Sequence, residues 1–151
     1  MTKIIQEIDP QNAIAVLSNI PEFTDPINHQ QFKTRLQTNP VILVAYSGKK
    51  PVGCKIGYDR FHDGSYYYWL GGVLPEYRNI SIAQQLNQKM EELAGEQGCD
   101  SIVFKTRNKF KSMLQFGLKN GYNIVGFKEK DDPLEHRIIL KKELRQQSSL
   151  Q

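Results

Sequence analysis

The spacing of apolar side chains changes along the chain between short runs and repeats of three or four residues. Short apolar or alternating runs are typical of β-strands, and a repeat near 3.6 residues is typical of an amphipathic helix. The runs predict strands over residues 3–8, 41–46, 52–60, 65–74, 101–105, 122–127 and 136–142. The helical repeat predicts helices over residues 79–95 and 109–120, and two shorter helices that follow Asp9-Pro10 and Asp25-Pro26. Each Asp-Pro pair indicates a helix start, because aspartate caps well and proline is tolerated at the first helical position.

The connections between the predicted strands indicate how the sheet is built. Between residues 41 and 74 the turns are too short for a crossover, so an antiparallel meander is expected. The later strands alternate with helices, which indicates parallel crossovers. The order β-α-α-β-β-β-α-β-α-β-β therefore predicts an α/β or α+β fold with one mixed sheet. We expect one domain over residues 1–145 and a loose polar tail over residues 146–151.

The composition agrees with a single globular domain. The chain has 151 residues, of which 39% are hydrophobic, which is enough for one core. No apolar run approaches the ~20 residues that cross a bilayer, and the first residues do not resemble a secretory signal. We therefore expect a cytoplasmic protein with no membrane partner. Cys54 and Cys99 form no CxxC pair, so we expect reduced structural thiols, with no disulfide and no metal.

The positive charge is modest and partly local. A total of 20 Lys and Arg against 16 Asp and Glu gives a net charge of +4. Basic residues gather over residues 105–111 and again at Lys141, Lys142 and Arg145. This distribution suits a phosphate-bearing ligand at least as well as nucleic acid, for which no aromatic-basic repeat is present. An ordinary solvated surface is the alternative for residues 105–111.

The stretch with the most chemical information runs from residue 70 to residue 86. Its strand contains Gly71-Gly72, and glycine inside a strand usually marks a bulge or the close approach of another backbone or a ligand. After Pro75 the chain turns into a helix, whose first N–H groups can bind an anion such as a pyrophosphate. The small residues Ser81 and Ala83 keep these groups accessible, and Arg78 can add a charged contact. The alternative is a plain strand-turn-helix with an exposed arginine.

Two segments resemble the GNAT superfamily of acetyltransferases. Val73-x-Pro75-Glu76-Tyr77-Arg78 followed by Arg78-x-x-Ser81-x-Ala83 is similar to its motif A, although Ser81 stands where the family usually has glycine. If position 81 keeps the backbone conformation of that glycine, a serine there is strained. Further along, Asn108 and Lys119-Asn120-Gly121-Tyr122 also look similar to the family pattern. The resemblance is strong in the second half of the chain and limited to element order in the first half.

The resemblance implies an acetyl-CoA site in a gap within the sheet. The strand at residues 70–74 would be bulged and splayed from the strand at residues 101–106, and the pantetheine arm would lie between them. Backbone groups of Gly72, Val73 and Leu74 would pair with the arm, and Asn108 would add a polar contact. The remaining implied cofactor contacts come from the helix start and from two lysines: Arg78, Asn79, Ile80, Ser81, Ile82, Ala83, Lys109 and Lys111.

The implied reaction is transfer of an acetyl group from acetyl-CoA to a primary amine by direct attack in a ternary complex. The acceptor would be a small-molecule or peptide amine. The strand before the bulge, Tyr66-Tyr67-Tyr68-Trp69, holds no carboxylate, so Tyr68 and Tyr67 are candidates for ordering a water, with aromatic packing as the alternative. Gly117 stands where many family members have an acidic tyrosine; Ser112 could substitute for it, or the missing side chain could widen the acceptor tunnel.

Other functional classes stay open on the sequence alone. A non-catalytic acyl-CoA-binding regulatory domain of the same fold is the main alternative, favoured by Gly117 and by the strand without carboxylates. A nucleic-acid or protein-binding module would use the basic residues 105–111, and a homodimer is compatible with the pattern. Candidate specificity elements are residues 20–36, 59–65 and 130–135.

Overall fold

The computed structural model describes residues 2–78 and 81–144, and a helix or strand is present there for each predicted one; the first two residues of the helix predicted over 79–95 lie outside the described part. The strands are β1 (Thr2–Glu7), β2 (Val41–Ser47), β3 (Lys50–Tyr58), β4 (Ser65–Val73), β5 (Ser101–Arg107), β6 (Asn123–Lys128) and β7 (Arg137–Glu143). The helices are α1 (Gln11–Leu17), α2 (His29–Arg35), α3 (Ile82–Glu96) and α4 (Lys111–Lys119), with short 3₁₀ helices η1 (Pro75–Tyr77) and η2 (Pro133–Glu135). Within these residues no helix is both long and apolar enough to cross a membrane. The predicted tail at residues 146–151 lies outside the described part.

The described strands form one mixed sheet in the order β1-β2-β3-β4-β5-β7-β6. Strands β1 to β4 pair antiparallel, because only short turns connect β2, β3 and β4. Strand β5 pairs parallel to β4, because α3 carries the chain back along the sheet between them. The predicted meander, the crossover and the mixed sheet are therefore confirmed.

The two helix starts predicted at Asp-Pro pairs differ from the prediction. Helix α2 does not begin after Asp25-Pro26, because Asn28 adopts an extended conformation and its side chain accepts a hydrogen bond from the Gln31 N–H at 3.0 Å. That contact satisfies one of the free N–H groups at a helix start, which is why the cap lies three residues later. At the first site Asp9 accepts from the Gln11 N–H at 2.8 Å, but the cap position itself is Pro10.

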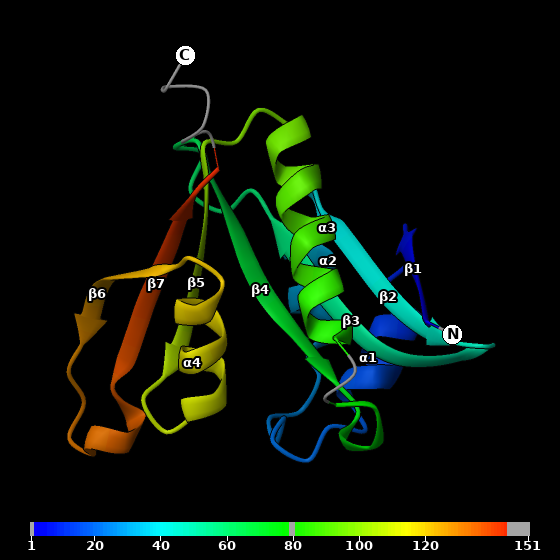
Figure 1. Cartoon of the computed structure of the whole chain (residues 1–151), viewed down its shortest axis with the longest axis horizontal. Helices are drawn as coiled ribbons and strands as arrows, with labels where there is room; N and C mark the ends of the chain where they lie inside the picture. The colour runs from blue at the N-terminus through cyan, green and yellow to red at the C-terminus, as the bar shows by residue number, and fades with distance from the viewer. Residues whose placement is uncertain (1, 79–80, 145–151) are drawn as a thin grey trace.

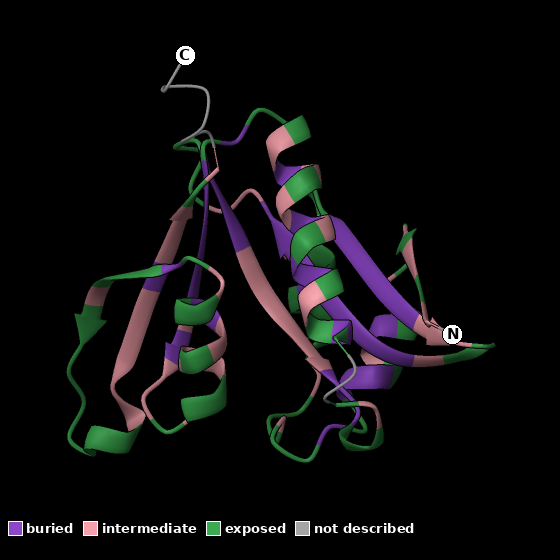
Figure 2. Ribbon diagram, viewed as in Figure 1, coloured by how far each residue is buried: buried purple, intermediate pink, exposed green. Residues whose placement is uncertain are grey.

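The helices cover both faces of the sheet, with α3 and α4 in front and α1 and α2 behind in the view of Figure 1. Successive strand residues point to opposite faces. Accordingly the Cys54 thiol reaches the Ala13 carbonyl of α1 at 3.6 Å, whereas a β-carbon at Gly53 would lie 3.1 Å from Ile82 of α3. The buried segments follow β2, β3 and the first half of β4, between the two helical layers, while the edge strand β6 is mostly exposed (Figure 2).

The sheet opens between β4 and β5. These strands pair only from Ser65↔Ser101 to Tyr68↔Phe104, and beyond that point they diverge (Figure 1). On the other side of β4 the register with β3 shifts, so that Ile56 pairs with Leu70 and Gly57 with Tyr68. Trp69 is the extra residue of this bulge, which bends the strand and strengthens its twist. The predicted bulged and splayed central strand is therefore confirmed.

Gly117 is a packing position between α4 and the sheet. A β-carbon there would lie 2.9 Å from Phe104 Cζ and 3.1 Å from Leu140 Cδ2. Both of these neighbours are buried. The hypothesis that Gly117 widens an acceptor tunnel is therefore wrong, because side chains of β5 and β7 already fill the space that a larger residue would take.

The two helical glycines Gly117 and Gly95 give a matched stability test. Gly95→Ala should stabilise the protein by about 1 kcal/mol, because alanine favours the helix and nothing lies within 4 Å of its β-carbon. Gly117→Ala should instead be destabilising, since overpacking of a filled core costs about 1–3 kcal/mol. Urea unfolding of both variants measures the difference. Equal stabilisation by the two substitutions would contradict the packing at Gly117.

Candidate functional site

A cleft of about 1210 Å³ lies where β4 and β5 diverge. Its walls come from β3, β4, β5, α3, α4 and the segment that follows α1. From the sheet it is lined by Cys54, Lys55, the run 68–73, Phe104, Lys105 and Thr106. From the helices and their ends it is lined by Leu17, Ile20, Glu22, Phe23, Tyr77, Arg78, the run 81–84, Leu86, the run 109–113, Phe116, Lys119 and Asn120.

The cleft has walls on both faces of the sheet. Trp69 faces α2, where its ring packs 4.8 Å from that of Phe32. Tyr68 faces the side of α3 and α4, and its ring lies 5.6 Å from that of Phe104. Both residues line the cleft, so its lining includes side chains from both faces of the sheet.

The backbone of β4 offers an open edge to this cleft. The Leu74 N–H donates to the Val52 carbonyl of β3 at 2.8 Å, so Leu74 directs its N–H away from the cleft. Backbone groups of neighbouring strand residues point to opposite edges, which directs the Val73 N–H toward the cleft side. Of the three predicted backbone contacts, Gly72 and Val73 line the cleft, whereas Leu74 does not.

The two glycines of β4 fit around protein atoms. A β-carbon at Gly71 would lie 2.8 Å from both the Cys54 carbonyl and the Tyr68 hydroxyl. At Gly72 it would lie 2.5 Å from Ile20 Cδ1. The predicted close approach at these positions is therefore made by the neighbouring strand and side chains, which keep the strand end narrow.

Arg78 closes the end of β4 against the segment after α1. Its Nε donates to the Val73 carbonyl at 2.9 Å, and its two terminal nitrogens each bind the Glu22 carboxylate at 3.0 Å. The hydrogen bonds from Arg78 lower the pKa of the Glu22 carboxyl. The guanidinium is thus engaged by the protein at the rim of the cleft.

The start of α3, where an anion site is predicted, borders the cleft. Ser81 occupies the N-cap position with φ +70° and ψ +12°, the left-handed conformation that favours glycine. The expected strain at Ser81 is therefore confirmed. Ser81, Ile82 and Ala83 line the cleft, and the first N–H groups of the helix have no partner within it. Asn79 and Ile80 lie outside the described residues.

The basic residues at the start of α4 are only partly directed into the cleft. Lys109 and Lys111 line its mouth, where Lys109 Nζ binds Glu135 at 2.6 Å and Lys111 Nζ binds Asn108 Oδ1 at 2.9 Å. Asn108 itself does not line the cleft, and its Nδ2 donates to the Pro133 carbonyl at 3.1 Å. The structure therefore brings the two lysines to the site but not Asn108.

The two candidate tyrosines lie in different surroundings. Tyr68 lines the cleft with its hydroxyl over Gly71, and burial raises its pKa. Tyr67 does not line the cleft. It packs against Tyr58 at 5.7 Å and lies under the Arg60 guanidinium at 4.8 Å from the ring centre. Only Tyr68 is therefore placed to order a water there.

Lys55 is a cleft residue that the sequence analysis missed. It is only 4% exposed, and its Nζ lies 3.6 Å from the centre of the Tyr68 ring and 5.7 Å from that of Phe116. Burial lowers its pKa to about 7, and this outweighs the opposing effects of Glu91 and Cys54. The available signal was a single lysine between apolar and small residues inside a predicted strand.

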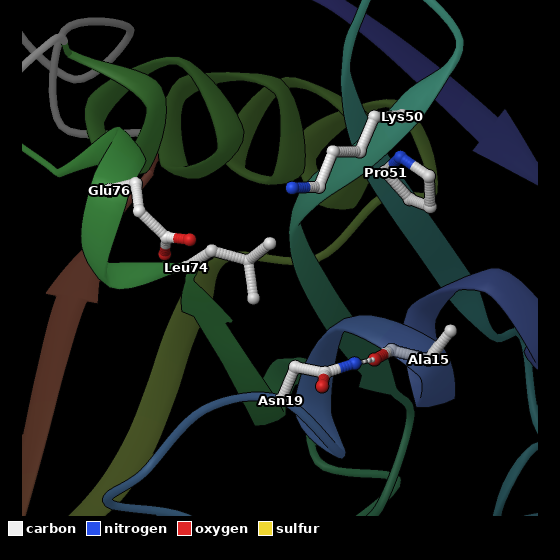
Figure 3. A pocket seen from close by; sticks show the side chains of 6 residues that line it. All are labelled: Ala15, Asn19, Lys50, Pro51, Leu74 and Glu76. Carbon is white, nitrogen blue, oxygen red and sulfur yellow. Dashed lines mark hydrogen bonds between the residues drawn. The ribbon is translucent and has the colours of Figure 1, made fainter.

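A second, smaller hollow of about 390 Å³ lies between α1, the start of β3 and the end of β4. Lys50 and Glu76 extend into it from two sides, and Asn19 donates to the Ala15 carbonyl at its floor at 2.9 Å (Figure 3). None of its six lining residues is shared with the larger cleft. The larger cleft, with its open strand edge and helix start, is the candidate active site.

The burial of Lys55 predicts a pH-dependent stability. Between about pH 7 and the ordinary value of 10.5, the unfolded chain binds a proton at Lys55 that the folded chain does not. The free energy of unfolding of the native protein should therefore rise with pH across this window. Lys55→Met should be more stable than the native protein at neutral pH, by a margin that shrinks toward pH 10.5. Urea unfolding from pH 6 to 10 measures this margin.

The exposed Lys128 on β6 gives the matched control. The difference in free energy of unfolding between Lys128→Met and the native protein should not change with pH. If the difference in free energy of unfolding between Lys55→Met and the native protein is equally independent of pH, then the pKa of Lys55 is not lowered in the folded protein.

Comparison with known proteins identifies the architecture around this cleft. A model of the acetyltransferase (GNAT) family matches residues 6–122. No curated protein has a matching sequence.

Solved structures match nearly the whole chain. The ribosomal-protein-S18-alanine N-acetyltransferase of Escherichia coli has a TM-score of 0.81 at 13% identity, covering 95% of this chain and 94% of that one. A GNAT family acetyltransferase of Elizabethkingia anophelis with acetyl-CoA bound has a TM-score of 0.74 at 16% identity, covering 94% and 97%. The PaiA N-acetyltransferase of Thermoplasma acidophilum in complex with coenzyme A has a TM-score of 0.71 at 15% identity, covering 95% and 99%. These similarities show a shared fold, and because the family model spans more than half of the sequence, the chain belongs to the GNAT acetyltransferase family.

Proposed function

We propose that the protein transfers an acetyl group from acetyl-CoA to a primary amine by direct attack in a ternary complex. The observation that carries this proposal is the cleft between β4 and β5, which combines an open strand edge with a helix start at its end. A strand edge can pair with the amides of an extended chain, and a helix start can bind a pyrophosphate. Acetyl-CoA has the two matching parts in the same order: a pantetheine arm with amide groups, followed by a pyrophosphate.

The cofactor arrangement follows from the open groups of the site. Val73 would contact the pantetheine arm at its thioester end, whereas Gly72, which pairs with Cys54 of β3, would only line the cleft beside the arm. The first turn of α3, at Ser81, Ile82 and Ala83, would hold the pyrophosphate. Lys109 and Lys111 at the mouth of the cleft suit the nucleotide phosphates. The similar folds solved with acetyl-CoA and with coenzyme A support this assignment.

The chemistry of acetyl transfer requires few special side chains. The amine lone pair attacks the thioester carbonyl, and the developing oxyanion needs a donor, for which the Val73 N–H is suitably directed. Such a donor contributes about 3 kcal/mol to transition-state stabilisation. Holding the two reactants between β4 and β5 in the geometry for attack would contribute about 7–11 kcal/mol more.

The acceptor would enter from the face covered by α1 and α2. The residues on that side, Leu17, Ile20 and Phe23, line the cleft opposite the start of α3. Such an arrangement would keep the two substrates on separate sides until they meet at the bulge. Tyr68 would order a water near the reacting atoms.

Acetyl-CoA turnover with a panel of primary amines tests the proposal. We expect acceptor-dependent release of the CoA thiol by the native protein. Val73→Pro removes the proposed oxyanion donor without breaking a bond to β3, so kcat should fall about 10²–10³-fold, with a much smaller loss of acetyl-CoA affinity. Val125→Pro, at the register shift of the exposed strand β6, is the matched control and should keep full turnover.

The same experiment separates the alternative. Saturable acetyl-CoA binding without thiol release on any amine would identify a regulatory acyl-CoA-binding domain. That alternative is favoured by Gly117, since Phe104 and not a hydroxyl side chain fills the space beside it.

A further inference from the structure

We propose that Lys55 is the proton-transfer residue of this cleft, taking the proton of the attacking amine and delivering it to the CoA sulfur. The inference rests on the proposed acetyl transfer. It assigns a role that neither Tyr68 nor position 117 can fill and that the sequence left without a residue.

The position of Lys55 in the sheet carries the inference. Lys55 pairs with Gly71 across β3 and β4, and Gly53 pairs with Val73. Lys55 therefore lies two residues along the strand from the backbone N–H proposed to hold the carbonyl oxygen. Its side chain crosses the floor of the cleft between the Tyr68 ring of β4 and the Phe116 ring of α4.

Three other titratable groups of the cleft are already engaged or protonated. The Glu22 carboxylate is bound by Arg78 in two hydrogen bonds. The Cys54 thiol donates to the Ala13 carbonyl on the far side of the sheet, and burial raises its pKa to about 12. Burial also raises the pKa of Tyr68, which keeps its phenol protonated.

The charges around Lys55 leave its proton exchangeable. Within residues 2–78 and 81–144, no carboxylate oxygen lies within 4.0 Å of its Nζ. Glu91 of α3 is the acid that acts on it, and that carboxylate is bound by Lys142 at 2.9 Å and Asn87 at 2.8 Å. Tyr68 of β4 and Phe116 of α4 present only neutral rings, and Cys54 on β3 is neutral.

The proton count of the reaction then closes without another reagent. The amine nitrogen forms a bond to the carbonyl carbon, the C–S bond breaks, and its electron pair leaves with sulfur. The neutral Lys55 amine takes the proton that the nitrogen must lose and becomes an ammonium ion. The ammonium ion protonates the thiolate, which yields amide and CoA thiol and returns Lys55 to the neutral form.

A group with this duty works best when both of its forms are populated near the operating pH. The pKa of about 7 for Lys55 meets that requirement, whereas an exposed lysine near 10.4 would not. The burial of Lys55 between the aromatic rings thus brings its pKa into the range that proton transfer needs.

The test compares Lys55→Met and Lys55→Arg with Lys128→Met as the control, using an amine that the native protein acetylates. Methionine keeps the length of the side chain but carries no proton, and arginine stays charged at all accessible pH values. We expect kcat to fall about 10²–10⁴-fold in both Lys55 variants. The acetyl-CoA dissociation constant of Lys55→Met should stay within about threefold of the native value, since removing a proton-transfer group leaves ground-state binding largely unchanged.

The pH profile supplies the readout that a packing role would not move. The kcat/KM of the native protein should rise with pH through a break near 7, and this break should be missing in Lys55→Met. Turnover of Lys55→Met within threefold of native, or an unchanged break, would overturn the proposal while leaving acetyl transfer intact. If Lys55→Met does not fold, a native profile without a break near 7 has the same consequence. A native protein that releases no thiol with any amine overturns both proposals.

Discussion

The parting of β4 from β5 after Tyr68 and Phe104 is the constraint on which the rest of the site depends. A continued parallel ladder would satisfy every backbone group of β4 and leave no edge for a ligand. The bulge at Trp69 turns the strand away from its neighbour, and the unpaired edge then has to find partners elsewhere. The cleft, the open N–H of Val73 and a lining drawn from both faces of the sheet all follow from this one break in pairing.

Several local features hold the opened strand in place. Gly71 and Gly72 let Cys54, Tyr68 and Ile20 pack at distances that a side chain would forbid. Arg78 ties the strand end to Glu22 through a carbonyl hydrogen bond and a bidentate ion pair. On the other side of the opening, Phe104 packs between the rings of Tyr68 and Tyr122, at 5.6 and 5.2 Å. The cleft is thus held open by packing on both walls.

The sequence predicts local features well and long-range contacts poorly. The helices, the strands, the bulged strand and the strain at Ser81 all follow from neighbouring residues or from the motif. The Arg78–Glu22 pair and the contact between Gly117 and Phe104 join distant segments. A pattern of neighbouring residues therefore cannot predict them. Lys55 shows the same limit, because its burial depends on rings from β4 and α4 that only the folded chain brings together.

Calorimetric titration with acetyl-CoA tests the central claim most directly, namely that the splay and the start of α3 form the cofactor site. Ala83→Glu places a negative charge at the first turn of α3, where it favours the helix but repels a pyrophosphate, and Ala83→Gln is its neutral match. We expect saturable one-to-one binding by the native protein, retained in Ala83→Gln and weakened at least about tenfold in Ala83→Glu, since tenfold corresponds to about 1.4 kcal/mol. Absence of binding by the native protein, or equal affinities of the two variants, would contradict the account.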